Sequence, residues 1–357
     1  NDRTFSIVGL TWTGERDVAA FVRSQKADGT WSEWFEMDPL NAREGSEKFG
    51  TEPIFVGKTK RVQVSTGGVD LLDGEIESVI VNGEEVEPEY DGSRIQLHGL
   101  HTHRENLVIV TAKLPYQHTG QGLHRFVDPA DGKVYLYTHF EAADSRRMYS
   151  VFEQPDLKAH VDFDVIAPSD WRVASNQVHE DIREEEDGLL HDFALTPRMS
   201  TYLTAIAAGP YVRFQDEWHS RDGSESIPLG ILARASLAEY VDHEEIFKIT
   251  KQGLAFYHRT FGYPYPWGKY DQIFVPEFNA GAMENAGCVT IRDEYVFTSQ
   301  ATHYKYERRA DTVLHELAHM WFGDLVTMQW WDDLWLNESF AEWASHHCQE
   351  KIVDKHG

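Results

Sequence analysis

The chain has 357 residues, of which 41% are hydrophobic, and it carries 33 lysines and arginines against 59 aspartates and glutamates. This length and apolar content suffice for two or three domains with buried cores, which excludes a fibre or a disordered tail. The net charge of −26 opposes binding to nucleic acid or to an anionic membrane surface, so we expect neither as a partner.

The two cysteines, Cys288 and Cys348, are too few for a disulfide framework and lack Cys-x-x-Cys spacing, which fits a reducing compartment. No apolar stretch approaches the roughly 18 residues of a membrane-spanning helix. No secretory signal is visible, and because the sequence starts at Asn1 and stops at Gly357 after a helix-like run, we expect both ends to be cut. We expect a cytoplasmic protein and make no prediction of its oligomeric state.

Residues 1–70 are predicted to form a small β-rich, sandwich-like module. Trp31 and Trp34 suggest a sugar-stacking pair, although aromatic residues in short strands more commonly belong to a core. Short strands separated by turn signals are expected at residues 5–12, 17–24, 31–37 and 61–65.

Residues 71–210 are predicted to form a second β-rich domain that ends near Gly209-Pro210. The Asn82-Gly83 dipeptide is a strong hairpin signal. Strands are expected at residues 76–81, at 161–165, where apolar and polar residues alternate, and at 202–207.

Residues 211–357 change from a period of two to one of about 3.6, which predicts helices. One helix should present Ile246 to Phe261 on its buried face. Strands are expected at 270–275 and 288–292. A further helix is predicted from an N-cap at Asp311 or Thr312 to a stop at Gly323, and another from residues 332–333.

The second of these helices carries a metal-site motif. His315 and His319 have the i, i+4 spacing of H-E-x-x-H, so both imidazoles lie on one helix face, with Glu316 beside them. Glu338, eighteen residues beyond His319, completes a set of two histidines and one carboxylate that is standard for catalytic zinc. We therefore predict one Zn²⁺ per chain.

The predicted chemistry is hydrolysis. One negative ligand leaves net positive charge at the metal, which lowers the pKa of bound water and polarises a carbonyl. Glu316 would accept the proton of that water and pass it to the leaving amine. Trp330, Trp331 and Trp335 are expected to form a dry wall around the site.

A second run, Gly281-Ala282-Met283-Glu284-Asn285, precedes the metal motif. Together with Asn337-Glu338 and Thr138 to Ala142, it resembles the aminopeptidase N family of zinc exopeptidases over about residues 72–357. The resemblance implies a saddle-shaped β domain followed by a thermolysin-like zinc catalytic domain. The expected class is therefore multidomain β and α+β.

The resemblance also implies substrate-binding residues. Gly281 and Ala282 would form a strand edge that a substrate backbone can approach closely. Glu284, aided by Glu141 from the β domain, would recognise the free α-ammonium of a peptide, and Met283 and Asn285 belong to the same run. Two carboxylates around one cation make a zinc hydrolase an exopeptidase.

Two features of the family are not found before Gly357: a tyrosine that stabilises the oxyanion and a helical C-terminal domain. We therefore expect residues 1–357 to bind zinc but to hydrolyse slowly, because one such donor contributes roughly 10²–10³ in rate. Residues 1–70 are instead similar to the β-rich region that precedes the catalytic domain of actinobacterial N-acetylmuramoyl-alanine amidases, as a natural fusion or a joining of two reading frames.

The sequence thus predicts a zinc aminopeptidase that acts on peptides with a free N-terminus by Glu316-assisted attack of zinc-bound water. A zinc endopeptidase or an epoxide hydrolase of the same family remains an alternative. A catalytically impaired, cell-wall-associated binding protein, secreted or attached through residues 1–70, is another. The preferred N-terminal residue is not predicted.

Overall fold

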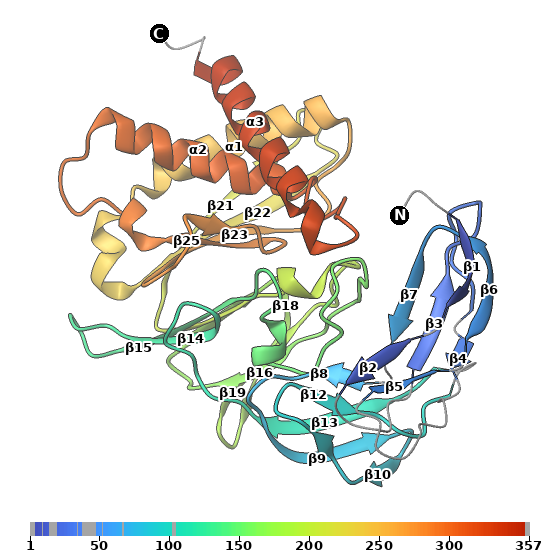
Figure 1. Cartoon of the computed structure of the whole chain (residues 1–357). Helices are drawn as coiled ribbons and strands as arrows, with labels where there is room; N and C mark the ends of the chain where they lie inside the picture. Colours follow the sequence, from blue (N-terminus) through green and yellow to red (C-terminus); the bar gives the residue numbers. More distant parts are fainter. Residues whose placement is uncertain are drawn as a thin grey trace. The chain divides into compact units, whose positions relative to one another are not determined.

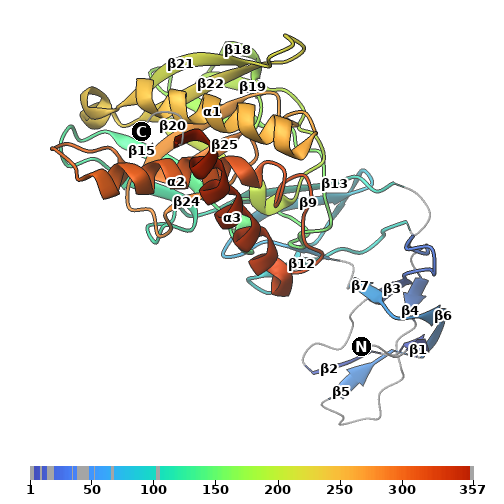
Figure 2. The same cartoon turned by 90° about the horizontal axis from the view of Figure 1, so that it is seen from above.

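The computed structural model of the chain describes residues 4–8, 10–13, 20–33, 35–37, 48–51, 53–65, 68–101 and 105–353. The chain divides into two compact units, an N-terminal unit (Asn1–Pro115) and a C-terminal unit (Tyr116–Gly357). Figures 1 and 2 show the elements of both. No helix in the described part of the chain is both long enough and apolar enough to cross a membrane.

The first part of the N-terminal unit consists of short antiparallel strands. Their bounds are Phe5–Val8 (β1), Thr11–Thr13 (β2), Ala20–Ser24 (β3), Phe35–Met37 (β4), Lys48–Gly50 (β5), Ile54–Thr59 (β6) and Val62–Ser65 (β7). β3 lies between β4 and β7, while β1 pairs with β6 and β2 with β5. Ala20 and Val22, on the buried side of β3, form a small core with Met37 and Val56. The first part of the unit therefore has an all-β core of its own.

The second part of the N-terminal unit is also antiparallel and has a separate core. Its strands are Gly68–Asp70 (β8), Glu75–Val81 (β9), Glu84–Val86 (β10), Glu89–Tyr90 (β11), Arg94–Gln96 (β12) and Val108–Lys113 (β13). β9 lies between β10 and β13, and β12 between β11 and β8. The predicted hairpin at Asn82-Gly83 is confirmed, because Val81 pairs with Glu84 and both turn residues have positive φ.

The C-terminal unit begins with two antiparallel sheets. The strands are Gly122–Val127 (β14), Val134–His139 (β15), Asp164–Ala167 (β16), Arg172–Ser175 (β17), His179–Glu185 (β18), Gly188–Phe193 (β19) and Ile206–Gly209 (β20). One sheet has the order β14-β15-β20-β17 and the other β16-β19-β18. Tyr135 and Tyr137 of β15 belong to the large core of this unit, so β15 is fixed firmly against the elements that follow.

A five-stranded mixed sheet follows. Its strands are Val212–His219 (β21), Ser226–Ala233 (β22), Tyr270–Val275 (β23), Ala282–Met283 (β24) and Cys288–Arg292 (β25), in the order β21-β22-β23-β25-β24. β23 is parallel to both neighbours and every residue of it is buried, as expected for a strand covered on two faces. The two-residue β24 forms the edge of the sheet, antiparallel to β25.

Three α-helices, His243–Phe261 (α1), His303–His319 (α2) and Leu334–Val353 (α3), lie on one face of this sheet (Figures 1 and 2). α1 is amphipathic and buries the face that the sequence predicted, including Ile246, Leu254 and Tyr257. Gly253 allows α1 to approach α2 closely, since a Cβ there would lie 2.6 Å from Leu314 Cδ2. The packing of α1 thus fixes the position of α2.

The start of α2 was predicted wrongly. Instead of an N-cap at Asp311 or Thr312, the helix begins at His303, after Thr302. Residues 303–308 are all exposed, so the first turns of this helix have no buried apolar face that the sequence could show. The first buried side chain of the helix is a charged one, Arg309, which is 1% exposed and donates to Asp242 Oδ2 at 2.8 Å.

Several strand bounds also differ from those predicted. One strand was expected at 5–12, but β1 ends at Val8 and β2 begins at Thr11. At 202–207, the chain first makes a 3-10 turn, in which the Thr204 hydroxyl donates to the Thr201 carbonyl at 2.7 Å, and β20 begins only at Ile206. Residues 17–19 and Trp34 lie outside the described residues. The domain boundaries near 70 and 210 stay predictions.

The close approach of α1 and α2 is testable at Gly253. A Gly253→Val substitution should lower the free energy of unfolding by about 1–3 kcal/mol, because the added methyl groups overpack the contact with Leu314 and Leu317. Ala255→Val, on the exposed side of the same helix, is the control and should change stability by about 0.5 kcal/mol. Urea unfolding curves would measure both, and equal effects would contradict close packing at Gly253.

Candidate functional site

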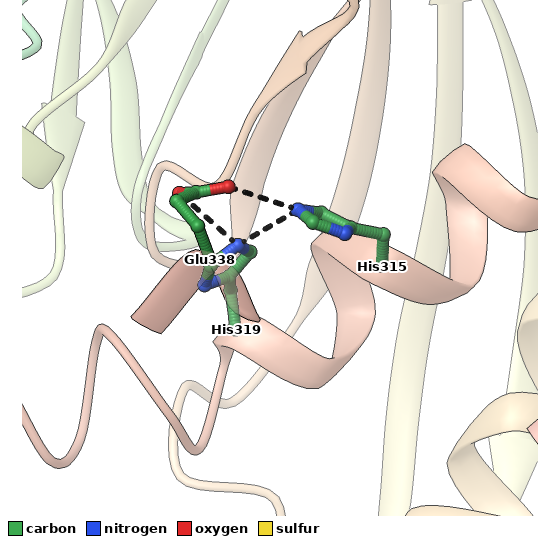
Figure 3. Close-up of side chains that lie close together, drawn as sticks. All are labelled: His315, His319 and Glu338. Carbon is green, nitrogen blue, oxygen red and sulfur yellow. Dashed lines mark hydrogen bonds and ion pairs between the residues drawn. The ribbon is translucent and has the colours of Figure 1, made fainter. Parts of the chain in front are cut away.

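The predicted ligands come together at the crossing of α2 and α3. His315 Nε2 lies 3.0 Å from His319 Nε2 and 3.3 Å from Glu338 Oε2, and His319 Nε2 lies 3.5 Å from Glu338 Oε1. Figure 3 shows the two rings from α2 and the carboxylate from α3 pointing at one another. Helical i, i+4 spacing brings the two histidines to one face, whereas helix packing brings Glu338 to them.

Hydrogen bonds between Asp311 of α2 and two residues of α3 hold α3 against α2. Asp311 lies one turn before His315 on α2, and its Oδ1 accepts from Ser345 Oγ at 2.8 Å and from Gln349 Nε2 at 2.9 Å on α3. The Asp311 side chain is buried, so these bonds are shielded from water. They fix the register in which Glu338 faces the histidines.

In each histidine, the contact that Nδ1 makes determines which ring nitrogen carries the proton and which has a free lone pair. His319 Nδ1 lies 2.9 Å from the Phe322 carbonyl oxygen, which can only accept, so Nδ1 carries the proton of the neutral ring. His315 Nδ1 lies 3.4 Å from Glu342 Oε2, another acceptor. Both rings therefore direct an Nε2 lone pair at the same place, which is the tautomer that a metal ligand requires.

A cavity of about 270 Å³ opens beside these ligands. Of the residues that the sequence predicted to bind substrate, Glu141, Gly281, Ala282 and Glu284 line it, as do Glu316 and two of the metal-ligand candidates, His315 and Glu338. Met283 and Asn285 are not among its lining residues and are buried, with 1% and 0% exposure. A direct contact of these two with substrate stays a prediction.

The carboxylates of the cavity repel one another. Burial and the charge of Glu284 raise the pKa of Glu141 to about 8, and burial and the charge of Glu338 raise that of Glu284 to about 7. Burial, with Glu284 and Glu338 nearby, raises the pKa of Glu316 well above its ordinary value. Ionising these acids together is therefore unfavourable in the cavity, and bound cations would favour their ionised forms.

Glu338 differs from its neighbours. Burial disfavours its ionised form, but interactions with His315 and His319 outweigh this and hold its pKa well below the ordinary value. An ionised carboxylate beside two imidazole lone pairs is a donor set that suits a divalent transition metal such as zinc. The residues present thus fit a zinc ion.

Two other groups of potential ligands occur among the described residues. Glu141 and Glu284 form one with Glu338, and Asp311, Glu342 and His346 form the other. Asp311 already accepts bonds from Ser345 and Gln349, and its Oδ2 lies 2.9 Å from Arg308 Nη1. The second group is therefore better explained as part of the contact between α2 and α3.

Part of the cavity lining was not predicted from the sequence. Arg308, Asp311 and Thr312 lie seven, four and three residues before His315, so helical spacing alone could have placed them on its face. Glu342 lies one turn after Glu338 and carries the same signal. Tyr295 also lines the cavity, and no pattern in the sequence pointed to it.

The predicted tryptophan wall is wrong. Trp330 and Trp335 are 50% and 62% exposed, and none of Trp330, Trp331 and Trp335 is among the cavity's lining residues. Trp331 instead packs edge-on against the buried Tyr202, with ring centroids 5.2 Å apart. The cavity wall is built from the β24 edge and the polar face of α2, because these elements flank the ligands directly.

Comparisons with known proteins agree with this geometry. Residues 246–356 match the model of the peptidase family M1 domain, residues 60–203 that of the peptidase M1 N-terminal domain, and residues 1–75 that of the Rv3811 N-terminal galactose-binding domain-like family. Aminopeptidase N of Streptomyces lividans is 51% identical over 297 residues, which is 82% of this chain. The chain belongs to the peptidase M1 family.

Other relatives extend the M1 match. Probable aminopeptidase 1 of Saccharolobus solfataricus is 34% identical over 85% of the chain. The crystal structure of Legionella pneumophila aminopeptidase A in complex with aspartic acid has the same fold, with a TM-score of 0.72 over 80% of this chain and 33% of that one, at 22% identity. The chain spans about a third of the length of the Streptomyces and Saccharolobus relatives, 34% and 37%.

These findings confirm the resemblance to the aminopeptidase N family and the multidomain β and α+β class. The match of residues 1–75 to a family other than M1 is compatible with the predicted separate origin of the first module. The roles of the individual M1 site residues stay predictions.

The orientation of His315 by Glu342 is testable without any activity assay. Glu342→Leu removes the acceptor for Nδ1 and should weaken zinc binding about 10–100-fold, because the ring loses its fixed orientation and tautomer. The control is Glu350→Gln, which changes an exposed acid on α3, the helix that carries Glu342, and should leave zinc affinity unchanged. Competition with a chromophoric chelator measures both, and equal zinc affinities of the two variants would contradict the role of Glu342.

Proposed function

We propose that the protein is a zinc-dependent aminopeptidase that removes N-terminal residues from peptides. The observation that supports this most is that Glu141 and Glu284 line the same cavity as His315, Glu316 and Glu338. A carboxylate pair next to a metal-ligand set offers one place for an ammonium group and another for a carbonyl. The distance between those places restricts cleavage to the first peptide bond.

His315, His319 and Glu338 would hold the zinc, one ion per chain. When bound, zinc supplies a Lewis acid that polarises a carbonyl oxygen and makes water more acidic. Burial and the neighbouring carboxylates raise the pKa of Glu316, and the charge of the ion would offset the second of these causes. The same residues would thus be stabilised by the ion that they bind.

Glu316 would move the proton. It is 5% exposed and lines the cavity directly after His315 in the chain. As a carboxylate it takes a proton from the attacking water, and as an acid it returns that proton to the leaving amine.

Glu284 and Glu141 would bind the substrate's α-ammonium. Oxygens of both carboxylates lie within 4.8 Å of one another and of Glu338, which suits a single small cation. A bound ammonium would favour the ionised form of both acids, since each pKa is raised by a neighbouring negative charge. A peptide with a blocked amine would leave that charge unpaired.

The substrate backbone would lie along the β24 edge at Gly281 and Ala282. Gly281 has no heavy atom within 4 Å of where a Cβ would stand, so this edge is open to an approaching chain. Peptides with a free N-terminus are therefore the proposed substrates, and we expect no nucleic-acid partner because of the net charge. A cytoplasmic location stays a prediction.

Glu316→Gln tests the proton transfer. The variant should retain zinc at the same stoichiometry but lower kcat for an amino-acid anilide about 10²-fold or more, because glutamine cannot accept the proton. Zinc content by atomic absorption and initial rates give the two readouts. Near-normal turnover would rule out this role for Glu316.

Glu284→Ala tests amine recognition. KM for peptides with a free N-terminus should rise by about 10-fold or more, since a charge-assisted hydrogen bond to the ammonium is lost. Glu244→Ala, on the exposed side of α1, is the matched control and should leave KM unchanged. Residual cleavage of N-acetylated peptides provides the comparison, and an equal loss for blocked and free peptides would contradict amine recognition.

A further inference from the structure

A short loop, residues 277–279, leads into the cavity edge and is held by the β14–β15 region. The buried His124 of β14 accepts the Gly120 N–H through Nδ1 at 3.0 Å, and its Nε2 lies 3.1 Å from Glu277 Oε2. Because Nδ1 accepts, Nε2 carries the proton of the neutral ring and donates to Glu277. Burial lowers the pKa of His124, which favours that neutral form.

The next residues of the loop make contacts of other kinds. The Phe278 ring is 4% exposed and packs against Tyr137 and His139 of β15, with ring centroids 5.6 and 4.8 Å apart. The Asn279 side chain donates to the Thr119 carbonyl. Three consecutive residues are thus held by a hydrogen bond from a neutral imidazole, by ring packing and by an amide hydrogen bond.

The backbone at Glu277 indicates that these contacts impose a conformation. Glu277 has φ of 53°, in the left-handed region that residues other than glycine rarely adopt. The Tyr137 hydroxyl donates to its carbonyl at 3.3 Å. On the other side of the contact, Gly120 has no room for a side chain, since a Cβ would lie 2.5 Å from Asn279 Nδ2. The two segments are therefore shaped to fit each other.

The two proposed amine-binding carboxylates lie on opposite sides of this contact. β15 ends at His139, two residues before Glu141. The loop continues through Ala280, Gly281 and Ala282, which line the cavity, to Glu284. A shift of the loop relative to β15 would therefore change the separation of Glu141 and Glu284.

We propose that the His124–Glu277 pair is a positioning device that sets the distance between Glu284 and Glu141, and hence the affinity for a free α-amine. This rests on the proposed function, because it assigns a supporting part to the same amine site. Neither His124 nor Glu277 is among the residues that line the cavity. They act through the loop and not on the substrate.

Two substitutions at His124 separate its hydrogen bond with Gly120 from its hydrogen bond with Glu277. Asparagine places an amide near Nδ1 and keeps a partner for Gly120 but not for Glu277, whereas glutamine places it near Nε2 and keeps the partner of Glu277. His124→Asn should weaken binding of L-leucinamide about tenfold, and His124→Gln should weaken it by less than threefold. Calorimetric titration of the zinc-loaded protein measures both, with N-acetyl-leucinamide as the ligand that lacks the amine.

Glu277→Gly provides an independent route, because glycine adopts the observed φ without strain while the carboxylate is lost. It should weaken leucinamide binding as His124→Asn does, and the double variant should show little further loss. The control is His258→Asn, since His258 Nε2 lies 3.4 Å from Glu225 Oε1 in a similar imidazole–carboxylate contact away from the cavity. Zinc affinity should be unchanged in every variant.

The outcomes separate the two proposals. If the unsubstituted protein binds zinc and leucinamide and His124→Asn and Glu277→Gly leave leucinamide affinity within twofold, the positioning role is wrong and the proposed function stands. Equal losses of leucinamide affinity for His124→Asn and His124→Gln would also overturn it. The hydrogen bond with Glu277, which glutamine keeps, would then make no difference to that affinity. If the unsubstituted protein binds neither ligand, both proposals fail together.

Discussion

The burial of several carboxyl groups in one cavity is the constraint on which the C-terminal unit depends. Glu284 and Glu316 are 3% and 5% exposed, and Glu141 and Glu338 line the same space. Carboxyl groups are rarely buried in this number, since each ionised form loses hydration and repels the next. Bound cations would stabilise the ionised forms, and under the proposed function these cations are a divalent metal and an ammonium group.

The elements around the cavity serve to keep those carboxylates in place. Asp311 fixes α3 on α2 through Ser345 and Gln349, and Gly253 lets α1 pack closely behind α2. The fully buried β23 supports the sheet whose edge is β24. Helices and sheet therefore form one core, and the polar site lies at its margin where a substrate can enter.

Different parts of the site were accessible to prediction to different degrees. His315 and His319 could be identified from the sequence because residues at positions i and i+4 of a helix always lie on the same face. Glu338 was found because its spacing from them is specific to a class of zinc sites. Glu342 lies at i+4 from Glu338, the same spacing as between the two histidines, and it was overlooked. Tyr295 had no signal in the sequence, because a 3-10 turn, Asp293–Tyr295, brings it to the cavity.

Two errors have a physical origin. The first turns of α2 are exposed, so no apolar pattern marked them and the start of the helix was placed too late. Trp330, Trp331 and Trp335 were assigned to a wall because aromatic residues line many pockets, yet two of them are exposed and Trp331 packs against Tyr202. No local pattern contains this second feature, because it depends on a partner distant in the chain.

The sequence by itself determined the residue types of the site, the helical spacing of His315 and His319, and the M1 resemblance. The spacing follows from local geometry, because residues within one or two helical turns have fixed relative positions. The tertiary structure decided which groups meet around these ligands. It brought Glu338 to the two histidines, Glu141, which follows β15, to the cavity that Glu284 lines, and His124 beside Glu277, 153 residues later in the chain. Only long-range packing can set such distances, because no local geometry relates residues so far apart in the sequence.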